Sequence, residues 1–387
     1  MVPKVKISSN IDVTQALEIS DNMKGGNCHP EEMKMKLDRD VSIDVLRGFA
    51  IFTMIAANTA GEILHEPHPF WFRFYGSFAA PLFIFIAGMM VFFTANKKQY
   101  DLKYFIKRGA MLIGIASLLD VFIWNLYPFM IFDVLYITGF SLPIAYLVSK
   151  LKNNWLKYSI IFAILLGTPV LHFIFGYPQN IKSLGFNDGY CLRDLFLILP
   201  YSFKHFTVDG WFPVFPWLGY SLLGASIARE RYSSETKFNN NKFLFLGIFA
   251  FTLGAILWYL FPGHMYTRVG FSEVFYPPTY GFMITSIGLI LLLFNFVDRN
   301  PMLSIYKPLK ILGGAALFVY ITQEIVIEKI ITVFFKEVNI QELFVVYSIF
   351  ILVLIGLCYL RMKIMKASKN NNLHRILLEK LMIKSNK

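Results

Sequence analysis

Ten long apolar runs constrain this 387-residue chain more than any other feature of its sequence. Each run is about as long as the roughly 20 helical residues that cross a bilayer. Membrane strands are disfavoured because the runs are too long and lack the alternation of a barrel. The sequence therefore predicts an all-α polytopic bundle of about ten transmembrane helices. The predicted spans lie near 43–62, 76–95, 107–126, 129–149, 156–176, 211–228, 243–262, 279–297, 311–334 and 343–362.

The composition also indicates a lipid bilayer as the main partner. Hydrophobic residues make up 56% of the chain and charged residues 16%, whereas a soluble domain carries about a quarter charged residues. The net charge of +12 does not predict a nucleic-acid partner, because Lys and Arg form short clusters between apolar runs. Cys28, Cys191 and Cys358 are isolated thiols without metal-site spacing, so no metal is expected.

The basic clusters predict the orientation in the membrane. Ten spans place both termini on one side, and 29 of the 37 Lys and Arg residues fall in the termini and connections of that side. Seven fall in the opposite connections. Because cytoplasmic segments are enriched in Lys and Arg, we expect cytoplasmic N- and C-termini. No organelle signal is evident, so the plasma (inner) membrane is the expected location.

The chain divides into a polar cytoplasmic leader at 1–42, a transmembrane domain at 43–362 and a basic cytoplasmic tail at 363–387. The tail carries apolar residues at roughly helical spacing, which favours a helix on anionic lipid over a partner-binding segment. The polar connection at 177–210 is expected to cover an outward-facing site. The third and fourth spans are predicted to meet in a tight turn near 125–128.

Polar side chains inside spans cost about 2.5–3.5 kcal/mol each on insertion scales, so each one suggests a function. Asp44 and Arg47 are three residues apart near the inner end of the first span and share one helix face. They form a structural ion pair, or Arg47 binds an anion such as a cofactor phosphate. Both interpretations stay open. Gly48 would let a neighbouring helix come close.

A second polar group lies at the outer end of the first span, where Asn58 is followed by His65, His68 and Trp71. A solvated loop histidine is the simpler interpretation. However, imidazole is well suited to accept a proton near neutral pH. A nearby amide can orient that ring or donate to a developing oxyanion.

Further polar residues lie in or beside the later spans. They are Asp120, Asp133, Gln323, Glu324, Glu328 and Lys329. Asp120 is a candidate to line a cavity and bind substrate. Glu324 and Glu328 are four residues apart, with Lys329 placed to neutralise one of them. Partners inside the bundle would also explain each of these groups.

Three stretches together resemble one family. They read SIDVLRGFAI at 42–51, PLFIFIAG at 81–88 and WFPVFPWLGY at 211–220. Their order and spacing are similar to those of the heparan-α-glucosaminide N-acetyltransferase-like membrane acyltransferases. The resemblance extends over about residues 42–335, which is most of the chain.

The resemblance implies transfer of an acetyl or other acyl group from cytoplasmic acyl-CoA, with acetyl-CoA as the expected donor. The acceptor would be an amine or hydroxyl of an extracytoplasmic sugar or glycan. His68 and Asn58 match the family's catalytic positions, and His65 is the alternative histidine. The candidate donor-binding residues are Asp44, Arg47, Lys107 and Arg108. The candidate substrate-binding residues are His65, Trp71, Asp120, Trp211 and Trp217.

Several alternatives stay open at this point. The histidine would act as a general base or form an acyl-histidine intermediate. The alternative function is a multi-pass transporter or flippase for a lipid-linked or anionic solute, which predicts inverted repeats that are not visible in the sequence. A membrane scaffold is a third interpretation. Gly313 and Gly314 permit close packing with another helix, including one from a second copy of the chain.

Overall fold

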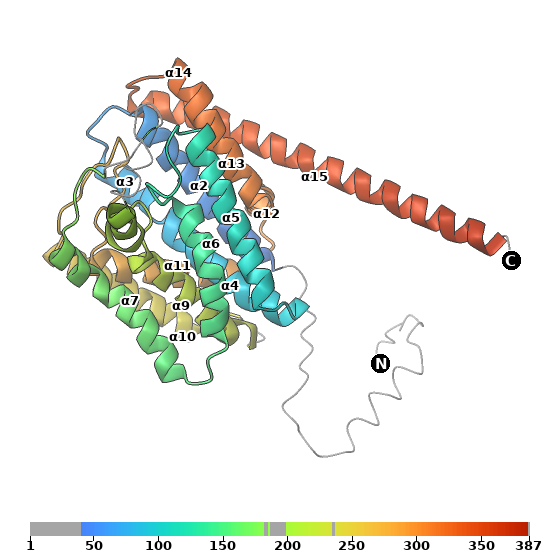
Figure 1. Cartoon of the computed structure of the whole chain (residues 1–387), viewed down its shortest axis with the longest axis horizontal. Coiled ribbons are helices and arrows are strands. Elements are labelled where there is room, and N and C mark those ends of the chain that lie inside the picture. Colours follow the sequence, from blue (N-terminus) through green and yellow to red (C-terminus); the bar gives the residue numbers. More distant parts are fainter. Residues whose placement is uncertain (1–39, 182–184, 186–198, 234–236, 386–387) are drawn as a thin grey trace, which may run out of the picture. The chain divides into compact units, whose positions relative to one another are not determined.

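The computed structural model describes residues 40–181, 185, 199–233 and 237–385, and these residues form helices and their connections (Figure 1). The all-α prediction is confirmed. The long helices are α2 (Val41–Ile63), α4 (Ala79–Lys98), α5 (Leu102–Phe122), α6 (Val134–Ser149), α7 (Asn154–Phe175), α9 (Val214–Ser233), α10 (Asn241–Leu260), α11 (Tyr280–Arg299) and α15 (Ile340–Ser385). The short ones are α3 (Phe70–Ser77), η2 (His205–Asp209), η3 (Ser304–Tyr306), α12 (Lys307–Gly314), α13 (Ala316–Val326), η4 (Ile327–Ile331) and α14 (Thr332–Phe334).

Six helical stretches in the described residues are long and apolar enough to cross a membrane. They are α2, α3 with α4, α7, α10, α11 and the part of α15 that ends at Ser368. The other predicted spans coincide with α5, α6, α9 and the α12–α14 segment, which are shorter, interrupted or more charged. The chain is therefore an integral membrane protein.

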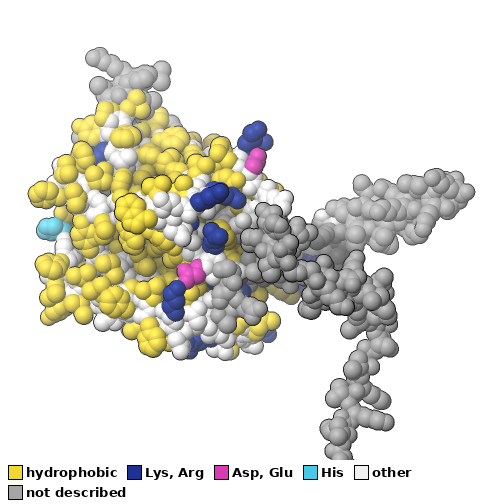
Figure 2. Space-filling view, turned by 90° about the horizontal axis from the view of Figure 1, so that it is seen from below, with side chains coloured by type: hydrophobic (Ala, Val, Ile, Leu, Met, Phe, Trp, Pro, Cys, Tyr) yellow, Lys and Arg dark blue, Asp and Glu magenta, His cyan; other side chains and the backbone are white. Residues whose placement is uncertain are grey.

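The helices differ in how much of their surface is buried. Only 17% of the most apolar window of α7 and 22% of that of α10 are buried inside the protein, against 67% for α2. Figure 2 shows a face on which hydrophobic side chains predominate. Such surfaces suit contact with lipid, whereas α2 packs inside the bundle with Ile51 and Ile55 fully buried.

Helices α2 and α12 cross at very short range through two glycines. A Cβ atom built on Gly48 would lie 1.9 Å from the carbonyl oxygen of Leu309, and one on Gly313 would lie 1.9 Å from that of Asp44. Only glycine fits such contacts. The close approach expected at Gly48 is confirmed. Gly313 makes its close contact within the chain, so this glycine is no evidence for contact with a second copy.

Buried ion pairs fix the beginning of α2 against α9 and α11. The Arg231 guanidinium is fully buried and donates to Asp40 at 2.5 Å and to Asp298 at 2.7 Å. Burial alone would raise the pKa of Asp40, but Arg231 and Lys237 lower it to about 2. These charges stabilise the fold only while they remain paired, because an unpaired buried charge is costly.

The predicted tight turn near 125–128 is wrong. Helix α5 ends at Phe122 and α6 begins at Val134, so the connection runs over 123–133. It folds back through backbone bonds from Leu126 to Asp120 and from Trp211 to Ile131. The sequence prediction failed because these bonds join segments far apart in the chain, and the apolar side chains of the loop resemble those of a helix.

The expectations for the leader, the connection at 177–210 and the tail concern segments that lie wholly or partly outside the described residues. The leader up to residue 39, with Cys28, lies outside them, and so do residues 182–184 and 186–198 of the connection at 177–210, with Cys191. The tail predicted at 363–387 begins inside α15, which continues without a break across residues 362 and 363.

Candidate functional site

Three adjoining cavities of different charge lie within the helix bundle. The acidic cavity, of about 210 Å³, is bordered by the carboxylic side chains of Glu62, Asp133, Glu273, Glu324 and Glu328. The basic cavity, of about 490 Å³, is bordered by Arg47, Lys97, Lys98, Arg108 and Arg361. A junction of about 50 Å³ shares Asn58, Asp133, Phe212 and Glu273 with the acidic cavity, and Phe83 and Tyr320 with the basic one.

Two helices contribute side chains along this series of cavities. On α2, Arg47 borders the basic cavity, while Asn58 and Glu62 border the acidic one. On α13, Tyr320 borders the basic cavity and Glu324 the acidic one. Residues four apart lie on the same helix face, so the polar side chains at the ends of this series come from the cavity-facing side of each helix.

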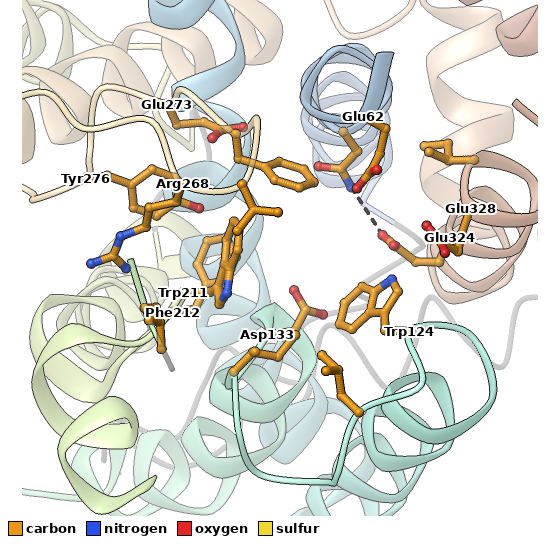
Figure 3. Close-up of a pocket in the computed structure, with 17 residues that line it drawn as sticks. Glu62, Trp124, Asp133, Trp211, Phe212, Arg268, Glu273, Tyr276, Glu324 and Glu328 are labelled. Atoms are coloured by element: carbon orange, nitrogen blue, oxygen red, sulfur yellow. Dashed lines mark hydrogen bonds between the residues drawn. The ribbon is translucent and has the colours of Figure 1, made fainter. Parts of the chain in front are cut away.

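Asn58 and Glu324 connect α2 to α13 at the edge of the acidic cavity (Figure 3). The Asn58 side-chain amide donates to Oε1 of Glu324 at 3.2 Å. The Gln323 amide donates to the same oxygen at 3.1 Å. An amide group carries two N–H donors, so the bond to Glu324 uses one of those of Asn58.

Asp133 and Tyr320 meet at the boundary between the two large cavities. Asp133 precedes α6, and the Tyr320 hydroxyl of α13 donates a hydrogen bond to its carboxylate. Both residues border the junction. Their bond therefore joins a residue that borders the acidic cavity to one that borders the basic cavity.

Glu273 lies in the loop between α10 and α11, and its neighbours in the chain are held by α3. Arg73 Nε donates to the carbonyl oxygen of Ser272 at 2.5 Å, and the backbone N–H of Val274 donates to Ser77 Oγ at 2.8 Å. Burial raises the pKa of Glu273 to about 7, an effect that Arg73 partly offsets. The loop thus presents to the cavities a carboxyl group whose pKa is raised by burial.

His68 is buried beside the same loop and has a defined tautomer. Its Nε2 lies 3.1 Å from the Leu64 carbonyl oxygen, which can only accept, so Nε2 carries the proton. Its Nδ1 accepts from the Ser272 hydroxyl at 2.6 Å. Burial lowers the pKa of His68 below its usual value. His68 borders a cavity of about 10 Å³ together with Arg73, Ser272 and Glu273.

The histidine and asparagine singled out by the sequence thus border different cavities. Asn58 lies at the junction, His68 borders the small cavity beside it, and Glu273 borders both. His65 is exposed, and its backbone N–H donates to the Val338 carbonyl oxygen.

The predicted donor-binding residues divide between the basic cavity and its surroundings. Arg47 and Arg108 border the cavity. Arg47 also donates to the Gly313 carbonyl oxygen at 3.3 Å and pairs with Asp44 at 3.5 Å. Asp44 is buried beside Arg47. Lys107 is exposed on the surface of α5. The ion-pair and anion-binding interpretations of Arg47 are therefore compatible.

The predicted substrate-binding residues are scattered. Trp211 borders the acidic cavity and packs edge-on against Phe271 and Tyr276. Trp217 is a core residue, 1% exposed. Trp71 is 55% exposed and stacks on Phe344 of α15. Asp120 is buried, and its carboxylate accepts a hydrogen bond from Tyr136.

Sequence reasoning missed several residues that border the cavities. Glu62 could have been found, because it follows Asn58 by four positions on one helix face. In the sequence, the basic residues Lys97, Lys98 and Arg361 indicate only the orientation in the membrane. Nothing in the sequence points to Glu273, since its position depends on contacts with α3. In the described part of the chain, no group of three or more His, Cys, Asp or Glu side chains is arranged to hold a metal ion.

Comparison with known proteins gives one match. Residues 39–262 match the model of the family described as heparan-alpha-glucosaminide N-acetyltransferase, catalytic. No curated protein matches the chain. The matched segment contains Arg47, Asn58, His68 and Asp133, whereas Glu273, Tyr320 and Glu324 lie beyond it.

Proposed function

Because the chain belongs to the heparan-alpha-glucosaminide N-acetyltransferase family, whose catalytic domain implies transmembrane N-acetyltransferase activity, we propose that it acetylates a sugar across the membrane. Acetyl-CoA is the cytoplasmic donor, and an amine or hydroxyl of an extracytoplasmic sugar or glycan is the acceptor. The observation that carries this proposal is the series of a basic cavity, a narrow junction and an acidic cavity.

The orientation of the cavities supports a donor from the cytoplasm. We propose ten spans with both termini cytoplasmic in the plasma membrane, on the positive-inside rule. The basic cavity is bordered by residues near the helix ends that this topology places inside, among them Arg47, Lys98 and Arg108. The acidic cavity is bordered by residues at opposite helix ends, such as Glu62 and Asp133.

The basic cavity suits the phosphate groups of CoA. Arg47, Arg108 and Arg361 offer planar guanidinium groups, which bind phosphate through paired hydrogen bonds. Lys97 and Lys98 add charge at the end of α4. From here the pantetheine arm would reach the junction, where the thioester meets Asn58 and Tyr320.

At the junction, Asn58 is the proposed donor to the thioester carbonyl oxygen. One amide N–H is held by Glu324, which leaves the second to stabilise the oxyanion that forms during attack. His68 is the proposed outer-loop histidine that receives the proton released in the reaction. Trp211 and the carboxyl groups of the acidic cavity would contact the acceptor.

Binding of acetyl-CoA to the purified protein tests this function. We expect saturable binding that weakens about tenfold or more in Arg108→Ala, since one lost hydrogen-bonded charge is worth about 1.5–3 kcal/mol. Lys107→Ala is the matched control, because Lys107 is adjacent in the chain but is not among the residues that border the basic cavity, and the affinity of this variant should stay within about twofold. A folded wild-type protein that binds neither acetyl-CoA nor longer acyl-CoAs would contradict the proposal and favour a transporter or flippase.

A further inference from the structure

Glu273 is the carboxyl group at which the acidic cavity, the junction and the small cavity beside His68 meet. It borders the acidic cavity, the junction and the small cavity of His68. It therefore faces the proposed acceptor space, the proposed thioester space and the outer-loop histidine at once.

One oxygen of this carboxyl group has no hydrogen-bond partner. Glu273 is 8% exposed, and its Oε2 is buried without a partner in the described part of the chain. Buried polar atoms are nearly always satisfied, so an unsatisfied one that borders a cavity needs a functional explanation. In the view of Figure 3, Glu273 and Asp133 border the acidic cavity from opposite sides. A hydrogen carried by a bound acceptor would satisfy Oε2.

The backbone on both sides of Glu273 is fixed before any substrate binds. Arg73 holds the carbonyl group of Ser272, and Ser77 holds the N–H group of Val274. His68 holds the Ser272 side chain through its Nδ1. A group that acts in catalysis needs such preorganised support.

We propose that Glu273 is a catalytic residue that removes the proton of the acceptor, an inference that rests on the proposed function. The acceptor nitrogen or oxygen attacks the carbonyl carbon of the thioester, and its proton moves to Oε2 of Glu273. The C–S bond then breaks, and CoA leaves as a thiolate that takes a proton from water in the basic cavity. Glu273 passes its proton to the Ser272 hydroxyl, whose own hydrogen moves along its bond to Nδ1 of His68, and His68 releases a proton to water outside.

The surroundings of Glu273 suit a base that works near neutral pH. Charged and titratable groups from several elements border the same cavities as Glu273. Its own loop contributes Arg268 and Tyr276, and the outer loop and α3 contribute His68 and Arg73. The others are Glu62 of α2, Asp133 before α6, Tyr320 and Glu324 of α13, and Glu328 of η4. Burial raises the pKa of Glu273 to about 7. A base of this pKa is charged in about half of the molecules at neutral pH and binds a proton more strongly than an ordinary carboxylate.

The test compares Glu273→Gln with Glu337→Gln, which changes an exposed carboxylate in the connection after α14. Both proteins are purified at full length and assayed with acetyl-CoA and two acceptor probes, glucosamine and glucose. We expect Glu273→Gln to lower kcat by about 10²–10⁴-fold, the usual contribution of a general base. Its acetyl-CoA affinity should stay within about threefold of wild type. Glu337→Gln should behave as wild type.

The pH dependence distinguishes a catalytic role from a structural one. In wild type, kcat/KM should rise as the pH increases through about 7, because only the deprotonated carboxylate accepts the proton. This rise should disappear in Glu273→Gln and persist in Glu273→Asp at a lower rate.

Unfolding provides a readout that needs no activity. Glu273 has a pKa of about 7 in the folded protein, against the usual glutamate value of 4.5 in the unfolded chain. Between pH 4.5 and pH 7 the unfolded chain loses this proton while the folded protein keeps it. The folded state therefore loses stability as the pH rises through this range. The thermal midpoint of Glu273→Gln should therefore exceed that of wild type at pH 8, with a smaller difference at pH 5.

The outcomes separate the two proposals. Wild-type transfer that Glu273→Gln retains within about threefold would overturn the role of Glu273 and leave the proposed function standing. A folded wild-type protein that transfers acetyl to neither probe would overturn both.

Discussion

Asn58 on α2 donates a 3.2 Å hydrogen bond to Glu324 on α13, across a separation of 266 residues. This bond joins the segment that the family model covers to one that lies beyond it. It also fixes an amide group at the junction of the basic and acidic cavities. The proposed transfer site is therefore built from both halves of the chain.

Replacing Asn58 by Ala removes the proposed oxyanion donor. We expect kcat to fall by about 10²–10³-fold, the loss measured for a single donor of this kind in other enzymes. Acetyl-CoA affinity should change little, because Arg47, Arg108 and Arg361 bind the phosphates in this account. Asn300→Ala, at an exposed position after α11, should keep wild-type rates. Steady-state kinetics with acetyl-CoA and glucosamine measure both, and an unchanged kcat in Asn58→Ala would exclude this role.

Replacing Tyr320 by Phe removes the hydroxyl that Asp133 accepts from, and keeps the ring. An unsatisfied buried partner costs about 1–3 kcal/mol, so the thermal unfolding midpoint should fall. Transfer should also slow, since Asp133 is no longer held at the junction. Tyr259→Phe is the control, because Tyr259 is 87% exposed. Equal midpoints and rates in the two variants would contradict the importance of the bond.

Replacing Gly48 by Ala places a methyl group 1.9 Å from the Leu309 carbonyl oxygen. Helices α2 and α12 must then separate, with a cost of about 1–3 kcal/mol or more, as in other overpacked sites. Because Arg47 also contacts the Gly313 carbonyl group, acetyl-CoA binding should weaken together with stability. Gly356→Ala provides the comparison, since a Cβ there meets nothing within 4 Å. A Gly48→Ala protein as stable as Gly356→Ala would be inconsistent with this packing.

Replacing Arg231 by Ala leaves Asp40 and Asp298 buried without their guanidinium partner. Loss of one member of a buried ion pair costs about 3–5 kcal/mol. The pair of Lys242 with Glu230 is exposed and screened by water, so Lys242→Ala should have little effect. Denaturant unfolding of the detergent-solubilised proteins compares the two, and similar losses of stability would show that Arg231 is not specially important.

The fold was largely predictable, because apolar composition and run length are local properties of the sequence. Each of the ten predicted runs coincides with helical residues. The connection at 123–133 was not predictable, since its path depends on backbone bonds to Trp211 and Phe212.

The candidate site was only partly predictable. Arg47 and Asn58 were found because polar groups stand out within an apolar helix. Lys107 and Arg108 are adjacent in sequence, and only the phase of α5 decides which one faces the basic cavity. Trp217 is a buried core residue, and its contact with substrate stays a prediction, since a core aromatic and a binding aromatic look alike in a sequence. Glu273 depends on contacts with Arg73 and Ser77 that no pattern reveals.

Transfer across a sealed membrane tests the central claim most directly. The protein is reconstituted into liposomes in one known orientation, with the proposed cytoplasmic termini facing the lumen. Radiolabelled acetyl-CoA is enclosed in the lumen, and glucosamine is added outside. We predict that labelled acetyl-glucosamine appears on the glucosamine side while acetyl-CoA stays enclosed. Product that forms only when donor and acceptor share one side would contradict the account.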